Sequence, residues 1–223
     1  MELCIFNKIE DDLCIKGILE KDNVIVLRNI IEFSETEGVT SSAIKEYVAT
    51  RLANDDNILS RLAQAGQFIG DDLYRLAKFD IEQIYKKLFS TQIKYAPSGN
   101  PIGFSNGYVA SIRAITESKS AQELLDLLIE HYRKFGSGIL AKYNAFRYDG
   151  ELIGVSNTDD ITFDSLVGIE YQKQVLIDNT KAFVSGKAAN NVLLFGDRGT
   201  GKSSSVKALL NMFCDDGLRI IEM

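Results

Sequence analysis

The chain has 223 residues, of which 45% are hydrophobic and 25% charged, as in ordinary globular proteins of one or two domains. Its net charge of −6 and its lack of a basic cluster argue against a protein that coats nucleic acid, since such binding neutralises phosphates. No apolar run approaches the roughly 18 residues that span a bilayer, and the start of the chain lacks signal-peptide features. We therefore expect a cytoplasmic location, with neither a membrane nor nucleic acid as partner.

Cysteine and histidine are scarce. The three cysteines, Cys4, Cys14 and Cys214, have no C-x-x-C spacing, and His131 is the one histidine. Neither a zinc site nor a disulfide framework is expected from this set, which fits a reducing compartment.

Residues 1–143 are predicted to form an α-helical N-terminal domain. Apolar residues at four-residue spacing indicate a helix through Ile44, Val48 and Leu52, which Thr40–Ser42 can cap. Two more helices are predicted after it. Their apolar residues are Ile58, Leu59 and Leu62 before Gly66, and then Leu73, Leu76, Ile84 and Leu88 between Asp71 and Phe89. Residues 2–35 also suit helices, with a strand at Val24–Leu27 as the alternative.

A loop at Lys94–Gly107, which holds both prolines, Pro97 and Pro101, separates this block from two further helices. The first is predicted at residues 108–117. The second is predicted at residues 121–134, with Ser120 and Glu123 as a capping box and Gly136 after its end.

The second of these helices carries a leucine stripe that ends at His131. Leu124, Leu127 and Leu128 continue toward it at helical spacing. We interpret the stripe as core or partner interface. We interpret His131 as a partly buried packing residue, because no partner acid or nucleophile is evident for catalysis.

The pattern changes at residue 144. Residues 144–155 are predicted to form a hairpin around Asp149–Gly150, a pair that suits a type I′ turn. The polar linker at residues 156–160 completes this connection, so residues 144–160 separate the helical domain from residues 161–223.

Residues 161–223 alternate between helical and strand patterns. Helices are predicted at residues 170–185 and 202–213, and apolar strands at residues 191–195 and 218–222. The expected fold is the beginning of an α/β P-loop domain with a parallel sheet.

The segment between the first strand and its helix fits G-x-x-x-x-G-K-[ST], the phosphate-binding P-loop. Glycines let successive N–H groups turn toward phosphate oxygens, and the helix after the loop adds its N-terminal dipole. Lys202 would place its charge between the β- and γ-phosphates, and Ser203 would give its hydroxyl to Mg²⁺. The predicted loop residues are Gly196, Asp197, Arg198, Gly199, Thr200, Gly201, Lys202, Ser203 and Ser204.

Four charged residues in or near the motif have more than one interpretation. Arg198 could contact phosphate, contact a neighbouring subunit or stay solvated, and Asp197 suits a turn better than catalysis. Asp215–Asp216 superficially resembles a Walker B end, but it follows the helix rather than a later strand, so a solvated loop is expected.

These residues together resemble the AAA+ ATPases. Phe163–Gly168 looks like the F-D-x-L-V-G segment that opens the AAA+ module, and it lies about 28 residues before the P-loop. The resemblance implies that Val167 and Gly168 lie beside the adenine. Residues 145–223 are similar to a bacterial family of predicted AAA+ ATPases of unknown function, whereas residues 1–144 share only its helical layout.

The resemblance implies an ATPase that binds ATP and Mg²⁺, assembles into a ring and couples hydrolysis to remodelling of a partner bound by the helical domain. The Walker B acid, sensor, arginine finger and lid of that family have no counterpart here. We therefore expect the front part of a larger ATPase, without hydrolysis by this segment alone, and predict no catalytic residue. A nucleotide-gated protein-binding module with little turnover is the alternative. A P-loop kinase of a small molecule would leave Phe163–Gly168 without a role.

Overall fold

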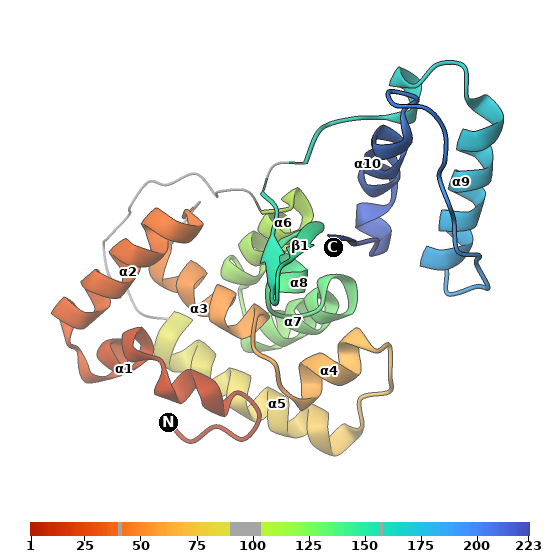
Figure 1. Ribbon diagram of the computed structural model, residues 1–223. Coiled ribbons are helices and arrows are strands. Elements are labelled where there is room, and N and C mark those ends of the chain that lie inside the picture. The colour runs from red at the N-terminus through yellow and green to blue at the C-terminus, as the bar shows by residue number, and fades with distance from the viewer. Residues whose placement is uncertain (40–41, 90–103, 157) are drawn as a thin grey trace. The chain divides into compact units, whose positions relative to one another are not determined.

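The computed structural model describes residues 1–39, 42–89, 104–156 and 158–223. The chain divides into two compact units, Met1–Lys142 and Tyr143–Met223 (Figure 1). The predicted loop at Lys94–Gly107 lies largely outside the described residues. None of the helices in the described ranges combines the length and hydropathy that crossing a bilayer demands.

The first unit is helical in every described element. Its elements are η1 (Asn7–Asp11), α1 (Leu13–Glu20), α2 (Asn23–Glu37), α3 (Ala43–Ala53), α4 (Ile58–Gln64), α5 (Asp71–Ile84) continued by the π-helical turn η2 (Tyr85–Phe89), α6 (Asn106–Thr116), α7 (Ala121–Phe135) and α8 (Ile139–Lys142). The predicted helices are confirmed, and the strand alternative at Val24–Leu27 is wrong. That segment is helical because Asp22 caps α2, accepting from the amides of Val24 and Ile25.

Two of the predicted caps differ in detail. Ser42 lies at the start of α3 without a side-chain capping bond, and Thr40 and Ser41 lie outside the described residues. Ser120 accepts from the amide of Glu123 as predicted, but the Glu123 carboxylate accepts from Lys119 instead of Ser120. The N-terminal amides of α7 are thus satisfied by a variant of the capping box.

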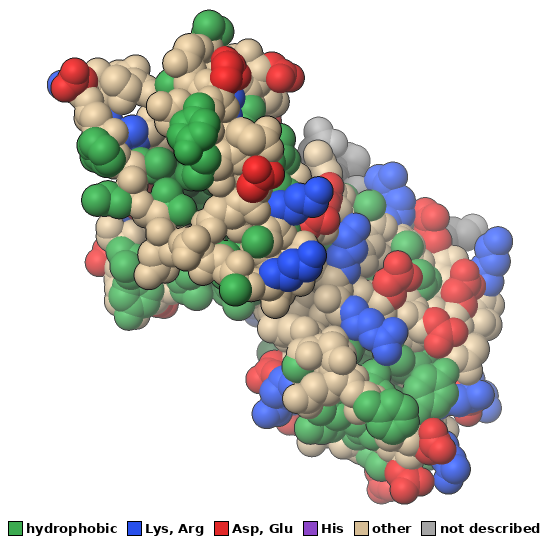
Figure 2. Space-filling model, turned by 90° about the vertical axis from the view of Figure 1, so that its right-hand side faces the viewer, with side chains coloured by type: hydrophobic (Ala, Val, Ile, Leu, Met, Phe, Trp, Pro, Cys, Tyr) green, Lys and Arg blue, Asp and Glu red, His purple; other side chains and the backbone are tan. Residues whose placement is uncertain are grey.

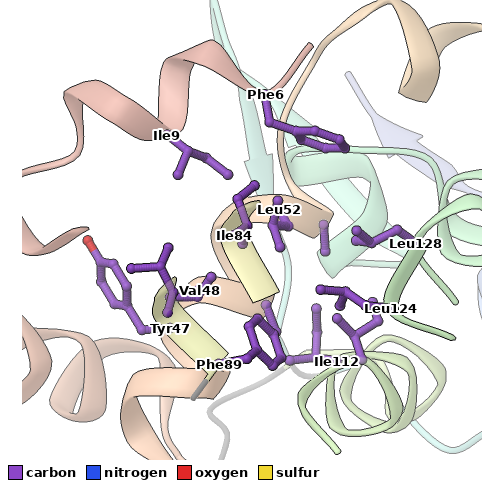
Figure 3. Packing of buried hydrophobic residues seen from close by; sticks show 14 of the residues in the cluster. Phe6, Ile9, Tyr47, Val48, Leu52, Ile84, Phe89, Ile112, Leu124 and Leu128 are labelled. Carbon is purple, nitrogen blue, oxygen red and sulfur yellow. The ribbon is translucent and has the colours of Figure 1, made fainter. Parts of the chain in front are cut away.

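The core of the first unit lies between α3, α5, α6 and α7. Figure 3 shows its side chains, among them Val48, Leu52, Ile84, Ile112, Leu124 and Leu128, all buried. One predicted stripe is confirmed only in part: Ile84 and Leu88 are buried as predicted, but the first half of the stripe is displaced. On α5 Ala77 and Ile81 face the core, whereas Leu76 is 44% exposed. Asp80 is buried as well, and its carboxylate meets the start of the chain.

The fully buried carboxylate of Asp80 ties the start of the chain to α5. It accepts hydrogen bonds from the amides of Cys4 (2.9 Å), Ile5 (2.6 Å) and Phe6 (3.1 Å). These amides precede η1, so the carboxylate satisfies donors that no helix or strand would satisfy. Asp80 therefore caps these amides as a local capping residue would, although it lies 74 or more positions away in the chain.

His131 is buried more completely than expected. Its Nδ1 lies 2.8 Å from the Ser111 hydroxyl, while its Nε2 is buried and has no hydrogen-bond partner within the described residues. The rings of Tyr108, Tyr132 and Phe135 surround it. Burial lowers the pKa of His131 to about 4, so the ring is neutral. Donation from Nδ1 to Ser111 is the favourable tautomer, because it leaves an unpaired acceptor rather than an unpaired N–H inside the core.

This burial predicts an acid-sensitive first unit. The folded pKa lies below the ordinary value of 6.5, so the unfolded chain binds more protons between those values and stability falls as pH falls through that window. When the pH is lowered from 7 to 5, we expect His131 to reduce the free energy of unfolding by about 2 kcal/mol. Urea unfolding of the wild type and of His131→Gln at both pH values measures this. An equal acid sensitivity in the two proteins would exclude His131 as its source.

The second unit contains two helices and a small mixed sheet. Its elements are β1 (Ala145–Tyr148), β2 (Leu152–Gly154), η3 (Phe163–Ser165), α9 (Glu170–Val184), α10 (Lys202–Phe213), η4 (Cys214–Asp216) and β3 (Ile220–Glu222). The strand order is β2-β1-β3, with β1 antiparallel to β2 and parallel to β3. In Figure 1 α9 and α10 lie side by side. A helical unit followed by a small α/β part is therefore what the structure shows.

The predicted hairpin is confirmed, but its turn is different. Tyr148 pairs with Leu152, which leaves a three-residue loop, and only Gly150 in that loop has a positive φ, of +80°. A type I′ turn would need two such residues, so a three-residue loop with glycine in the left-handed region forms instead. Gly154 is required for another reason, since a Cβ there would lie 2.2 Å from the Tyr143 ring.

The strand predicted at residues 191–195 is not formed. Within the described ranges no strand pairs with this segment, and Val192, Leu193 and Phe195 are 51%, 83% and 87% exposed. An apolar run becomes a buried strand only beside a partner strand, and β3 pairs with β1 instead. The only parallel pair in the described part of the chain is thus β1 with β3.

Candidate phosphate-binding site

The loop between residues 196 and 201 has the backbone of a tight, glycine-dependent turn. Gly199 and Gly201 have φ of +84° and +83°, values that strain a residue with a side chain. The Thr200 hydroxyl donates to the Asp197 carbonyl at 2.9 Å and closes the turn. The loop conformation is thus set by its own sequence.

The Lys202 ammonium lies over this loop. It donates to the carbonyl oxygens of Gly196 (2.9 Å) and Asp197 (2.7 Å). A positive charge is therefore held at the loop, where an anion bound by the same backbone would meet it.

The start of α10 offers a row of unused donors. Gly201 is the N-cap residue and has no side chain to cap the helix. Among the described residues, the first amides of α10, those of Lys202, Ser203 and Ser204, donate to no protein acceptor. These amides and the positive end of the helix dipole match the oxygen atoms of a phosphate, so the residues present fit such a group.

Ser203 lies in the first turn of α10 and is exposed. Its hydroxyl has no protein partner within the described ranges, so it is available as an oxygen ligand of the kind that Mg²⁺ prefers. Ser204 is half-buried, and the side chains of Asp197 and Arg198 are exposed. Neither Asp197 nor Arg198 forms an ion pair in the described structure, and the position of neither side chain indicates a chemical role.

The structure brings the Phe163–Gly168 segment to the loop. Phe163 is buried, and a Cβ on Gly201 would lie 3.7 Å from the Leu166 side chain. Val167 is 88% exposed, and Gly168, with φ of +83°, turns the chain into α9. Figure 1 shows this segment and the loop at the same end of α9 and α10.

Several polar residues that form hydrogen bonds or ion pairs around the loop belong to no recognisable sequence motif. Asn211 donates to the backbone carbonyls of Asp159 and Ile161, and Lys207 forms an ion pair with Asp159. On the other side, Asn179 exchanges two hydrogen bonds with the backbone of Asn190 (2.8 and 2.9 Å). Sequence reasoning missed all of these, because an asparagine on a helix gives no signal until its distant partner is known.

Two remaining features lie away from the loop. Asp215–Asp216 forms part of η4 after α10 and is exposed, as expected of a solvated loop rather than a Walker B end. A groove of about 310 Å³ in the second unit is lined by Phe183, Leu209, Leu218 and Ile220, among others, and by none of the predicted site residues. The candidate site is therefore an open loop rather than this groove. Figure 2 shows one face of the molecule, with both acidic and basic side chains on it.

Comparison with protein families gives a match to part of the chain. Residues 141–223 match the model of a family described as Protein of unknown function (DUF815). The matched range contains the whole second unit, with the hairpin, the Phe163–Gly168 segment and the loop. Comparison with curated proteins and with solved structures gives no match.

Proposed function

We propose that Gly196–Ser204 binds the phosphates of Mg–ATP and that the second unit is the opening part of an AAA+ ATPase domain. The observation that carries the proposal is the row of unused amides at the uncapped start of α10, with the Lys202 ammonium held beside it. A chance glycine-rich turn would not bring these donors and this charge together. The G-x-x-x-x-G-K-[ST] spacing supports the same conclusion.

Each residue has a defined role in this proposal. The loop amides bind phosphate oxygens, and Lys202 exchanges its two loop carbonyls for the β- and γ-phosphates. Ser203 would hold Mg²⁺, which neutralises phosphate charge when bound. Val167 and Gly168, which follow Leu166 at the loop, offer surface to the ribose and base.

For the longer protein that the resemblance implies, we propose that ATP hydrolysis drives remodelling of a protein partner held by the helical unit, in a ring of subunits. The nucleotide-gated binding module remains the alternative. Phosphate release measured on that protein separates the two, because a gated module binds the nucleotide without releasing phosphate.

The Mg²⁺ dependence of binding tests the proposal directly. We expect the wild-type chain to bind ATP about tenfold more tightly with Mg²⁺ than with EDTA, and Ser203→Ala to lose that gain while its binding in EDTA is unchanged. Isothermal titration calorimetry measures both. Ser185→Ala removes an exposed hydroxyl at the end of α9 and should behave as wild type. Absence of ATP binding by the wild-type chain would overturn the proposal.

A further inference from the structure

The segment made of η3 and the residues just before it lies along α10. We call residues Asp159–Leu166 the strap. Asn211 holds one end of it, since its side-chain amide donates to the carbonyls of Asp159 and Ile161, both at 2.9 Å. Leu166 at the other end lies against Gly201. Gly201 and Asn211 are about 15 Å apart along the helix at 1.5 Å per residue, so the strap spans most of α10 and ends at the loop.

Asn211 is the contact that fixes the strap backbone. The neighbouring ion pair between Lys207 and Asp159 joins side chains that are 47% and 60% exposed, and such pairs contribute little. The two bonds from Asn211 instead satisfy backbone carbonyls that no helix or strand pairs. Between the two ends, the buried ring of Phe163 packs in the second unit and keeps the middle of the strap in place.

We infer that Asn211 is a positioning residue for the nucleotide, acting through the strap to hold Val167 and Gly168 beside the phosphate loop. The inference rests on the proposed function. Val167 follows Leu166 directly, and its apolar side chain is 88% exposed beside a loop of polar donors. It cannot bind phosphate, but it offers contact to the apolar faces of the ribose and base. Substitution of Asn211 should therefore weaken binding of the nucleoside part of the ligand without changing how the loop binds the phosphates.

The comparison of two ligands isolates this role. Asn211→Asp keeps the side-chain shape but removes the N–H donors and turns a carboxylate toward two carbonyls. We expect Mg–ATP to bind this variant about tenfold more weakly in calorimetric titrations, a loss equal to about one net hydrogen bond. Mg–tripolyphosphate should bind both proteins within about twofold, because the loop, Lys202 and Ser203 are unchanged.

Two control variants separate the strap from general effects of charge. Asp159→Ala removes the ion pair with Lys207 but keeps the carbonyl that Asn211 binds, so it should bind Mg–ATP as wild type does. Asn29→Asp on α2 makes the same amide-to-acid change, and it also removes a bond to a backbone carbonyl, that of Ile25. It should leave both ligands unaffected.

Hydrogen exchange of the strap amides is the second readout. Mg–ATP should slow exchange at residues 159–166 in the wild type, and this protection should be lost in Asn211→Asp. An equal loss of ATP and tripolyphosphate binding would overturn the inference, because Asn211 would then order the whole loop. Unchanged ATP binding and unchanged protection would also overturn it. If the wild type binds neither ligand, the proposed function itself fails and the inference with it.

Discussion

Replacing Lys202 by alanine is expected to weaken Mg–ATP binding about a thousandfold, equivalent to roughly 4 kcal/mol. The ammonium already lies over the loop, 2.9 and 2.7 Å from the carbonyl oxygens of Gly196 and Asp197. Removing it leaves those carbonyls facing bound phosphate without a cation between them, and an anion beside unscreened carbonyl oxygens is repelled. Titration with a fluorescent ATP analogue, checked by calorimetry, measures the loss.

The matched control for this prediction is Lys187→Ala. Lys187 is exposed, lies just after α9 and has no side-chain partner within the described residues, so the variant changes the net charge equally. It should bind the analogue within about twofold of wild type, as expected for a surface charge away from the ligand. Binding that survives Lys202→Ala but falls with Lys187→Ala would point to attraction by the general charge of the chain and against a P-loop.

Asp80→Ala is expected to lower the free energy of unfolding of the first unit by about 4 kcal/mol. The carboxylate is fully buried and is the acceptor for the amides of Cys4, Ile5 and Phe6. Alanine would leave these donors unsatisfied, and Phe6, which is 0% exposed, would lose the anchor of its backbone. Urea unfolding followed by helical circular dichroism measures the effect.

Glu82→Ala is the control for Asp80, because it removes an exposed carboxylate from the same helix. It should change the unfolding free energy by no more than about 0.5 kcal/mol. The unfolding free energy of Asp80→Asn should lie between those of the two alanine variants. The asparagine side chain can still accept hydrogen bonds with its oxygen, but its nitrogen can only donate. A stable Asp80→Ala variant would show that the start of the chain contributes little to the first unit.

The sequence predicted the local elements of both units. Capping residues and apolar spacing act over one or two helical turns, so α7, α9 and α10 were found close to their true bounds. The hairpin was found for the same reason, although a single glycine with positive φ, Gly150, decided its turn. The loop motif was also readable, because its spacing alone requires glycines and a lysine at fixed positions.

The prediction failed where a strand needed a partner. The apolar run at residues 191–195 resembles a buried strand in its local pattern, yet Leu193 and Phe195 are exposed and β3 pairs with β1. An apolar sequence indicates that burial would stabilise the segment. The partner strand that would bury it, however, comes from another part of the chain. No local sequence pattern distinguishes an apolar segment that pairs with a neighbouring strand from one that stays unpaired.

By itself the sequence determined the positions of most helices and of the hairpin turn, and it predicted that the residues from Gly196 to Ser204 bind phosphate. Only the tertiary structure decided that Asp80 caps amides 74 to 76 positions earlier, that Ser111 meets His131 and that Asn211 holds the strap against α10. The reason is physical. Helix periodicity and turn chemistry depend on neighbours a few residues away, whereas a buried polar group is satisfied by whichever distant donor or acceptor the completed packing brings to it.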